Sequence, residues 1–402
     1  MTTQFDIRRI ARAGESRIIL LIADGLGGYP HPDTGRSELE AARLPNLDAL
    51  ARESACGLTV PVAPGITPGS GPGHLALLGY DPVRHHVGRG VMEALGVGLD
   101  LAEEDAAARG NFCIVDNVGR LVDRRAGRIS SERGAELADL LDRIERSHGE
   151  VSVHGVRGHR FVAVFRGAGS NLEVTDTDPG LEGCRPLRSE PLTENSGDLA
   201  AAVNAFAARA GHALKDSQAQ AVVLRGISSP TPLPSFADRY MLHPAAIAAY
   251  PMYRGLAKLA GMEVLDTGDD FGQEIATLSA AFSTGSHDFF FLHYKPADAA
   301  GEDGDFEAKV EAMEALDSKI PAILQLEPDV LIVAGDHSTP AVVGGHSWHP
   351  VPIAVNSKLT RGDGVPEFTE RAVRDGSLGT MAATSVMALA LAHGGRLNKY
   401  GP

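Results

Sequence analysis

The chain has 402 residues, 43% of them hydrophobic and 22% charged, which is the composition of a globular protein long enough for two domains. Its formal net charge of −15 argues against a nucleic-acid partner, because proteins that bind nucleic acids are usually basic. No apolar run reaches the ~18 residues of a membrane span and no secretory signal is visible. The three cysteines (Cys56, Cys113 and Cys184) are too scattered for a disulfide framework, so we expect a cytoplasmic protein without a membrane partner.

The first predicted strand covers residues 17–23, RIILLIA, and ends at an acidic residue followed by glycines. A continuous apolar run suits a strand of a parallel sheet that is buried on both faces. Asp24 then lies where open α/β sheets bind ligands, although a simple turn aspartate explains it equally well. A helix over 47–53, capped by Asn46, and a strand over 57–62 follow.

The stretch 67–81, TPGSGPGHLALLGYD, places Ser70 between two glycines at the start of an apolar helix. Glycines let a backbone come close to a ligand, and the free N–H groups at a helix start favour an anion. Ser70 is therefore placed like a nucleophile that meets a phosphate or acyl group. The alternative is a glycine- and proline-rich turn with an N-capping serine.

An inserted domain is predicted over residues 86–235, between a first domain formed by 1–85 and 236–402. The chain becomes rich in glycine near 85–100 and rich in proline near 230–238, which marks the two crossings. The elements predicted inside the insert are a hairpin over 111–122, a helix from Ser130 to about Ser147, strands over 151–156 and 160–165, a helix over 198–212 and a strand over 222–224. Mixed hairpins between two alternating strand–helix segments indicate an α/β domain with an insert.

Strands and helices alternate again in the last segment. Helices are predicted over 245–259 (with a break at Pro251), 271–282, 305–316 and 377–393, and strands over 288–294, 329–334 and 352–355. Acidic residues and histidines come after two of these strands: Asp298 and Glu302 after 288–294, and Asp336, His337 and His346 after 329–334. Each could be a solvated loop side chain. Together with Asp24 they would supply oxygen and imidazole ligands for two divalent ions, a set that fits Mn²⁺, Mg²⁺, Zn²⁺ or Co²⁺.

Nine stretches from near residue 18 to about residue 355 carry a family resemblance, in this order: IADGLGG, ELEAARLPNLDALA, ITPGSGPGHLALLGYDP, RGVMEALGVGLDL, RGNFCIVD, VDRRAGRI, HRFVAVFRG, YPMYRGLAKLAGM and GDHSTP…HS…PVP. The serine loop and GDHSTP are the specific ones. The chain resembles the cofactor-independent phosphoglycerate mutases of the archaeal type, within the alkaline phosphatase superfamily. The resemblance implies an alkaline-phosphatase-like α/β domain, with a mostly parallel sheet and helices on both faces, plus a smaller inserted α+β domain.

The resemblance also implies a reaction and its ligand sets. The expected activity is that of an isomerase of glycolysis and gluconeogenesis that interconverts 3-phosphoglycerate and 2-phosphoglycerate through a phosphoserine at Ser70, without 2,3-bisphosphoglycerate. By position, one ion would be held by Asp24, Ser70, Asp336 and His337, and the second by Asp298, Glu302 and His346, with Mn²⁺ expected first. Glu302 stands where the family has a histidine, which should shift the preference toward harder ions. His349 is the other histidine close to His346, and a local structural role is equally plausible for it.

The inserted domain is expected to hold the small-molecule substrate through arginines, since a guanidinium binds carboxylate and phosphate bidentately. The candidates are Arg124, Arg125, Arg128 and Arg160, and the alternative is that some of them pair with Asp123 or Glu132. A metal-dependent phosphatase or phosphomutase acting on another small phosphate ester is the alternative enzyme. A binding protein that lost metal at Glu302 is the alternative from another class. The oligomeric state is not predicted.

Overall fold

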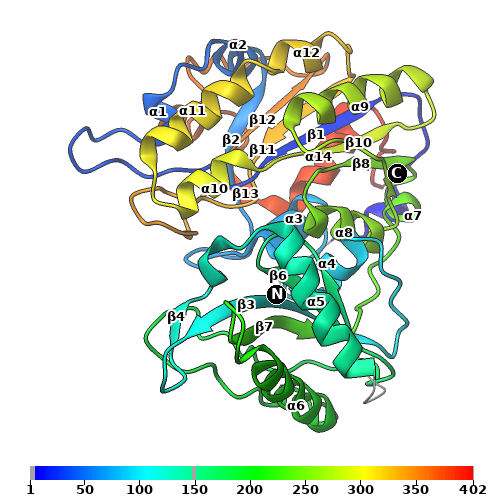
Figure 1. Cartoon of the computed structure of the whole chain (residues 1–402). Coiled ribbons are helices and arrows are strands. Elements are labelled where there is room, and N and C mark those ends of the chain that lie inside the picture. Colours follow the sequence, from blue (N-terminus) through cyan, green and yellow to red (C-terminus); the bar gives the residue numbers. More distant parts are fainter. Residues whose placement is uncertain (1–4, 147–150, 402) are drawn as a thin grey trace. The chain divides into compact units, whose positions relative to one another are not determined.

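The computed structural model describes residues 5–146 and 151–401, which form two compact units (Figure 1). Unit 1 contains the described residues up to His86, Leu233–Tyr250 and those from Ala260 onward, and unit 2 contains Val87–Pro232 and Pro251–Leu259. The sequence analysis placed the insert at residues 86–235 and so left Pro251–Leu259 in the other domain. This segment forms helix α8 (Pro251–Leu259), which packs so closely on α4 (Arg89–Gly96) that a Cβ on Gly255 would lie 1.7 Å from the Met92 carbonyl oxygen.

An eight-stranded sheet forms the centre of unit 1, in the order β13-β2-β12-β11-β1-β10-β8-β9. Its strands are β1 (Ile18–Ala23), β2 (Ala55–Val60), β8 (Pro244–Ile247), β9 (Glu263–Val264), β10 (Phe289–Tyr294), β11 (Val330–Ala334), β12 (Val351–Ser357) and β13 (Gly379–Ala382). Strand β12 is antiparallel to both its neighbours, and the other paired strands run parallel. The predicted fold class, a mostly parallel sheet in an α/β protein, is confirmed.

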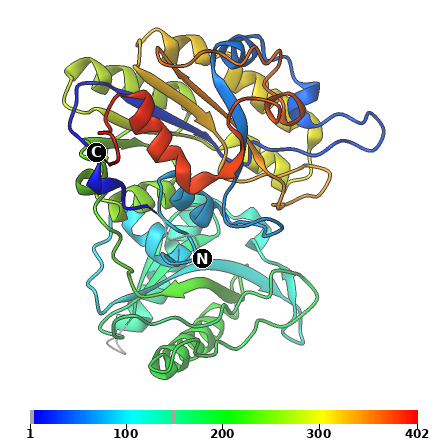
Figure 2. The ribbon, with the colours of Figure 1, turned by 180° about the vertical axis from the view of Figure 1, so that it is seen from behind.

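Helices cover both faces of this sheet, as the two opposite views show (Figures 1 and 2). On one face, alternate residues such as Ile19 and Leu21 of β1 share a core with α2, α9, α11 and α12. On the other face the ring of Phe236 in α7 lies 4.7 Å from that of Phe289, and α14 packs on β11. The helices of unit 1 are α1 (Glu38–Ala41), α2 (Pro45–Glu53), α3 (Ser70–Leu77), α7 (Phe236–Tyr240), α9 (Phe271–Thr284), α10 (Pro296–Glu302), α11 (Phe306–Asp317), α12 (Ile320–Leu324), α13 (Glu370–Val373), α14 (Val386–His393) and the 3₁₀ turns Ile7–Arg9 and Ala383–Ser385.

Unit 2 is built on an antiparallel sheet in the order β4-β3-β6-β5, with β7 also paired to β3. Its elements are α4, β3 (Ala106–Val115), β4 (Leu121–Asp123), the 3₁₀ turn Ala126–Arg128, α5 (Ser131–Arg146), β5 (Val151–Gly155), β6 (Arg160–Phe165), α6 (Gly197–Leu214), β7 (Ala221–Ser228) and α8. Alternate residues of β3, Ala106, Ala108 and Phe112, enter a core with α5 and α6. Because strand side chains alternate, Arg109 and Asn111 belong to the opposite face.

Two predicted helices are wrong in part. The segment 245–259 begins as strand β8 before α8, and the segment 377–393 begins with β13 before α14. In the first case parallel pairing to β10 and complete burial override the helix preference of an alanine-rich run. Asn46 is not the N-cap of α2, because Leu44 takes that position and the Asn46 amide donates to Asp317 instead. The predicted end of a helix at Ser147 lies outside the described residues.

Within residues 5–146 and 151–401, none of the helices combines the length and the hydropathy that crossing a membrane requires.

Candidate active site

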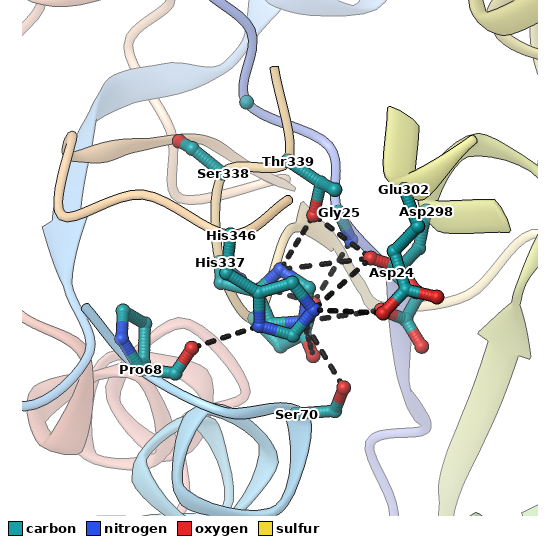
Figure 3. A network of polar contacts seen from close by, with 12 residues as sticks. Asp24, Gly25, Pro68, Ser70, Asp298, Glu302, His337, Ser338, Thr339 and His346 are labelled. Atoms are coloured by element: carbon teal, nitrogen blue, oxygen red, sulfur yellow. Dashed lines mark hydrogen bonds and ion pairs between the residues drawn. The ribbon is translucent and has the colours of Figure 1, made fainter. Parts of the chain in front are cut away.

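The polar residues of the site come from the ends of three neighbouring parallel strands. Strand β1 lies between β10 and β11, so their carboxyl ends meet at one edge of the sheet. Asp24 follows β1, Asp298 lies on α10 directly after β10, and Asp336 and His337 follow β11. Figure 3 shows the side chains of Asp24, Asp298 and His337 pointing toward one another, with Ser70 beside them on α3. This edge is where open α/β sheets place their ligands.

The first group of potential metal ligands consists of Asp24, Asp336 and His337, whose ligand atoms lie within 4.8 Å of one another. All three side chains are fully buried. The His337 Nε2 atom lies 3.3 Å from Asp24 Oδ1, 3.2 Å from Asp336 Oδ2 and 3.1 Å from the Ser70 hydroxyl. Burial lowers the pKa of His337 despite these carboxylates, which favours the neutral imidazole that a metal requires. The structure therefore brings Ser70 to the first predicted ligand set.

The second group consists of Asp298, His337 and His346, again with ligand atoms within 4.8 Å. His346 Nε2 lies 3.5 Å from Asp298 Oδ1 and 3.6 Å from Glu302 Oε1. The side chain of Glu302 is 50% exposed, whereas that of Asp298 is buried. Glu302 thus approaches this group at its solvent side. His349 contacts the Ser347 hydroxyl and stacks on Trp348. These contacts are with its own neighbours in the sequence, as a local structural role predicts.

Three residues that the sequence analysis did not select surround the predicted ligands. His74 Nδ1 lies 3.0 Å from Asp336 Oδ2 and 2.8 Å from the Ser70 carbonyl oxygen. His293 Nε2 lies 3.1 Å from Asp24 Oδ2. A signal for His74 was present, because it stands four residues after Ser70 on the same helix and hence on the same side. His293 could also have been noticed in the sequence, because it is a histidine inside the apolar strand β10.

Lys295 is the third of these residues, and its ammonium contacts a carboxylate of each group. Its Nζ atom lies 3.0 Å from Asp24 Oδ2 and 2.5 Å from Asp298 Oδ2. Burial acts to raise the pKa of Asp24, but Lys295, His293 and His337 hold that pKa well below its ordinary value. Burial also acts to raise the pKa of Asp298, and again cationic neighbours outweigh it. Asp24 and Asp298 therefore remain ionised, which is the form in which a carboxyl group binds cations.

The donor set fits a pair of divalent cations. Three buried carboxylates at one edge of a sheet are costly unless cations neutralise them, and here they alternate with imidazoles at ligand distances from one another. Two glycines make the close approach possible: a Cβ on Gly25, which has a φ of +67°, would lie 2.7 Å from Asp298 Cα, and one on Gly73 would lie 2.2 Å from the Asp336 carbonyl oxygen. Neither position accepts a side chain.

In unit 2, the four arginines predicted to bind substrate differ in their surroundings. Arg124 donates from Nε and Nη2 to both oxygens of Asp178, at 2.9 and 2.7 Å, and not to Asp123 or Glu132. The Asp123 carboxylate instead accepts the backbone N–H groups of Arg125 and Gly127. Together with the positive φ of Ala126 (51°) and Arg128 (55°), this fixes a strained loop. Strain of this kind is concentrated at functional sites, which supports a binding role for the loop.

A cluster of arginines, of which the sequence analysis selected only Arg160, lies between α4 and the sheet of unit 2. Arg109 is 2% exposed, pairs in register with Arg225 on β7, and places Nε 3.4 Å from Glu93 Oε2. Burial and the charges of Arg89 and Arg225 lower the pKa of Arg109 to about 9. The charges that act most on Arg109 are those of three arginines (Arg89, Arg160 and Arg225) and one carboxylate, Glu93. Arg109 Nε and Nη1 are buried without a hydrogen-bond acceptor. The cluster is therefore suited to an anion.

Comparison with known proteins gives consistent matches along the whole chain. Residues 51–220 match the family model described as 2,3-bisphosphoglycerate-independent phosphoglycerate mutase. A protein of Thermus thermophilus named "Probable 2,3-bisphosphoglycerate-independent phosphoglycerate mutase" is 47% identical over 403 residues, covering 98% of each chain. A protein of the same name from Thermotoga sp. is 46% identical over 399 residues, with the same coverage.

Solved structures match over nearly the full length as well. A protein of Pyrococcus horikoshii superposes with a TM-score of 0.81 at 27% identity, covering 96% of this chain and 99% of that one. The cofactor-independent phosphoglycerate mutase of Thermoplasma acidophilum gives a TM-score of 0.63 at 30% identity, covering 94% and 99%.

Proposed function

The chain belongs to the family of 2,3-bisphosphoglycerate-independent phosphoglycerate mutases, and from this we propose that it is an isomerase that interconverts 3-phosphoglycerate and 2-phosphoglycerate. The observation that carries the proposal is the position of the Ser70 hydroxyl, 3.1 Å from His337 Nε2 at the edge of a buried acidic cluster. A nucleophile beside ligands for cations is the arrangement that phosphoryl transfer requires.

The proposed reaction has two transfers that share one serine. In the first, Ser70 Oγ attacks phosphorus, the bond between phosphorus and the substrate oxygen breaks, and the serine proton ends on that departing oxygen. In the second, the other hydroxyl of the bound glycerate attacks the phosphoserine and returns its proton to Ser70 Oγ. The phosphoryl group comes from the substrate itself, so 2,3-bisphosphoglycerate is not needed.

We propose that two divalent cations are held at these two groups, one by Asp24, Ser70, Asp336 and His337, and the other by Asp298, His346 and the neighbouring Glu302. When bound, such cations would neutralise phosphoryl oxygens and favour ionisation of the serine hydroxyl, with Mn²⁺ expected ahead of Mg²⁺, Zn²⁺ and Co²⁺. His74 holds the Ser70 carbonyl oxygen and Asp336 through one ring nitrogen, and so orients the nucleophile and a ligand together.

Unit 2 is proposed to bind the carboxylate of the substrate and to retain glycerate between the two transfers. Support comes from the excess of guanidinium groups around Arg109 and from the strained loop that carries Arg125 and Arg128. Arg160 remains a proposed contact. Arg124 can offer only the donors that Asp178 leaves over, so it has the smaller part.

The test is to incubate the protein and Mn²⁺ with 3-phosphoglycerate and to measure 2-phosphoglycerate and free phosphate separately. We expect isomer in large excess over phosphate, and loss of both in Ser70→Ala. Free phosphate as the main product would mean that the protein is a phosphatase, and substantial turnover by Ser70→Ala would exclude the phosphoserine intermediate.

We also propose that the activity belongs to glycolysis and gluconeogenesis in the cytoplasm. The three free cysteines are in line with a reducing compartment.

A further inference from the structure

A buried lysine lies directly behind the loops that carry the metal-ligand groups. Lys309 on α11 is fully buried, and its Nζ atom donates to the carbonyl oxygens of Gly27, at 2.9 Å, and Thr339, at 2.8 Å. Gly27 belongs to the loop after β1, which begins with Asp24, and Thr339 belongs to the loop after β11, which contains Asp336 and His337. One ammonium group therefore joins two of the three loops that form the site.

Thr339 connects this lysine to both ligand groups. Its hydroxyl donates to Asp298 Oδ1 at 2.8 Å, and it lies 2.9 Å from His337 Nδ1. Thr339 also packs against α10, the helix after β10 that carries Asp298. A Cβ on Gly301 in α10 would lie 2.2 Å from the Thr339 carbonyl oxygen. A shift of the Thr339 backbone would thus move a carboxylate of one group and an imidazole that both groups share.

Two glutamates, the buried Glu38 and the partly buried Glu370, complete the support for these loops. Glu38 lies 3.8 Å from Lys309 Nζ and accepts the backbone N–H groups of Tyr29 and Ala341, one from each loop. Glu370 accepts the N–H of Gly28 at 2.7 Å. Carboxyl groups that accept backbone N–H groups of the loops in this way are suited to fixing the geometry of those loops.

We propose that Lys309 is a positioning residue that fixes both metal-ligand groups through the Thr339 backbone. This rests on the proposed function in one respect only, namely that the two groups bind cations. An apolar side chain at position 309 would leave the Thr339 carbonyl oxygen without its buried donor, and the loop would relax to find another. Residues that orient ligands in this way typically contribute about 10–100-fold to metal affinity.

The experiment measures Mn²⁺ binding to the apoprotein by electron paramagnetic resonance, without substrate. Lys309→Met should weaken binding by about tenfold or more. The matched control is Arg396→Met, which also removes a fully buried cation from unit 1, one that contacts Ser16 and Asp288 instead. That control should lose thermal stability but keep its Mn²⁺ affinity. Equal affinity in Lys309→Met and the unaltered protein, or equal loss in both variants, would overturn the proposal.

A second pair of variants tests the same connection at Thr339. Thr339→Val removes the hydroxyl and should weaken Mn²⁺ binding, whereas Thr339→Ser keeps the hydroxyl and should retain most of it. The loss in the double variant Lys309→Met/Thr339→Val should be smaller than the sum of the single losses, because both act on one path. Should Lys309→Met not fold, equal Mn²⁺ affinity in Thr339→Val and Thr339→Ser would overturn the proposal by itself. Failure of the unaltered protein to bind Mn²⁺ would instead contradict the proposed function.

Discussion

Two clusters of buried charge, one in each unit, are balanced in opposite ways. In unit 1 the carboxylates of Asp24, Asp298 and Asp336 lie among imidazoles and one lysine. In unit 2 Arg109 has Glu93 as its carboxylate neighbour at 3.4 Å, while Arg89 and Arg225 add like charge. In the acidic cluster, cationic neighbours keep the pKa values of Asp24 and Asp298 low although burial acts to raise them. In the basic cluster, burial and the charges of neighbouring arginines lower the pKa of Arg109 to about 9.

The difference indicates which kind of ligand each cluster is suited to bind. Carboxyl groups with low pKa values, such as Asp24 and Asp298, can bind cations without first losing a proton. The acidic cluster of unit 1 is therefore suited to metal ions. A guanidinium whose pKa is lowered by burial and by other guanidiniums would be stabilised by an added negative charge. The two clusters are therefore suited to ligands of opposite charge, in line with the proposed divalent cations and anionic substrate.

The largest expected effect comes from removing one charge of the acidic cluster. Asp336→Asn keeps the shape of the side chain but removes a ligand charge, so we expect activity to fall by about 10³-fold or more, with loss of Mn²⁺ binding at one of two sites. The matched control is Asp329→Asn, at the opposite end of β11, where the carboxylate accepts only the Arg17 backbone N–H among its described hydrogen bonds. Steady-state rates and Mn²⁺ titration provide the measurement, and similar activities of the two variants would contradict the assignment.

The next effect comes from the basic cluster. Arg109→Lys keeps the charge but removes the planar fork, so the KM for 3-phosphoglycerate should rise by about tenfold while Mn²⁺ affinity stays unchanged. Arg166→Lys is the control in the same unit, because Arg166 pairs with Asp105 and its side chain is 44% exposed. A KM increase of the same size in both variants would show that general weakening of unit 2, and not anion binding, is responsible.

The two clusters also differ in how far the sequence predicts them. Asp24 and Asp336–His337 follow strongly apolar runs directly, and parallel pairing of β1, β10 and β11 then brings their ends to one edge. Ser70 was marked by the glycines on either side of it. The structure brings all of these together, although their roles as ligands and nucleophile stay predictions.

The basic cluster depends instead on pairing that the sequence does not reveal. Arg109 and Arg225 are 116 positions apart and become neighbours only through the antiparallel register of β3 with β7. The predicted hairpin began at residue 111, so Arg109 was not recognised as part of a strand. Strand β8 was missed for a related reason, since its alanines prefer a helix and only pairing to β10 makes the segment a strand.

A smaller effect is expected at the solvent side of the acidic cluster. Glu302→Gln keeps the size of the side chain but removes its charge, so affinity for the second Mn²⁺ ion should fall by less than about tenfold, because the group is 50% exposed. Glu302→His should shift the preference from Mg²⁺ and Mn²⁺ toward Zn²⁺. Competition titrations with Mg²⁺ and Zn²⁺ measure this, and unchanged relative affinities in both variants would exclude Glu302 as a ligand.

The smallest effect concerns a buried acid, Glu274, whose pKa is dominated by burial and not by a cationic neighbour. Glu274 is buried, and burial, together with Asp270, raises its pKa to about 8, although the Ala249 N–H donates to it at 2.6 Å. Whereas Asp24 and Asp298 of the acidic cluster are balanced by cationic side chains, Glu274 is balanced by a proton. In the unfolded chain it ionises near pH 4.5, so folding takes up a proton between about pH 4.5 and 8, and stability falls as the pH rises through that range.

Glu274→Gln keeps the acceptor for the Ala249 N–H but cannot ionise, so it should remove this part of the pH dependence. We expect the variant to match the unaltered protein near pH 5 and to be more stable by about 1 kcal/mol near pH 9, since water that enters the site on ionisation reduces the full effect. Urea unfolding at the two pH values is the measurement, and Glu263→Gln, whose side chain is 66% exposed, is the control. A stability gain that is equal at pH 5 and pH 9 would mean that Glu274 is ionised in the folded protein, and that burial without a cation does not suffice to keep an acid of this chain neutral.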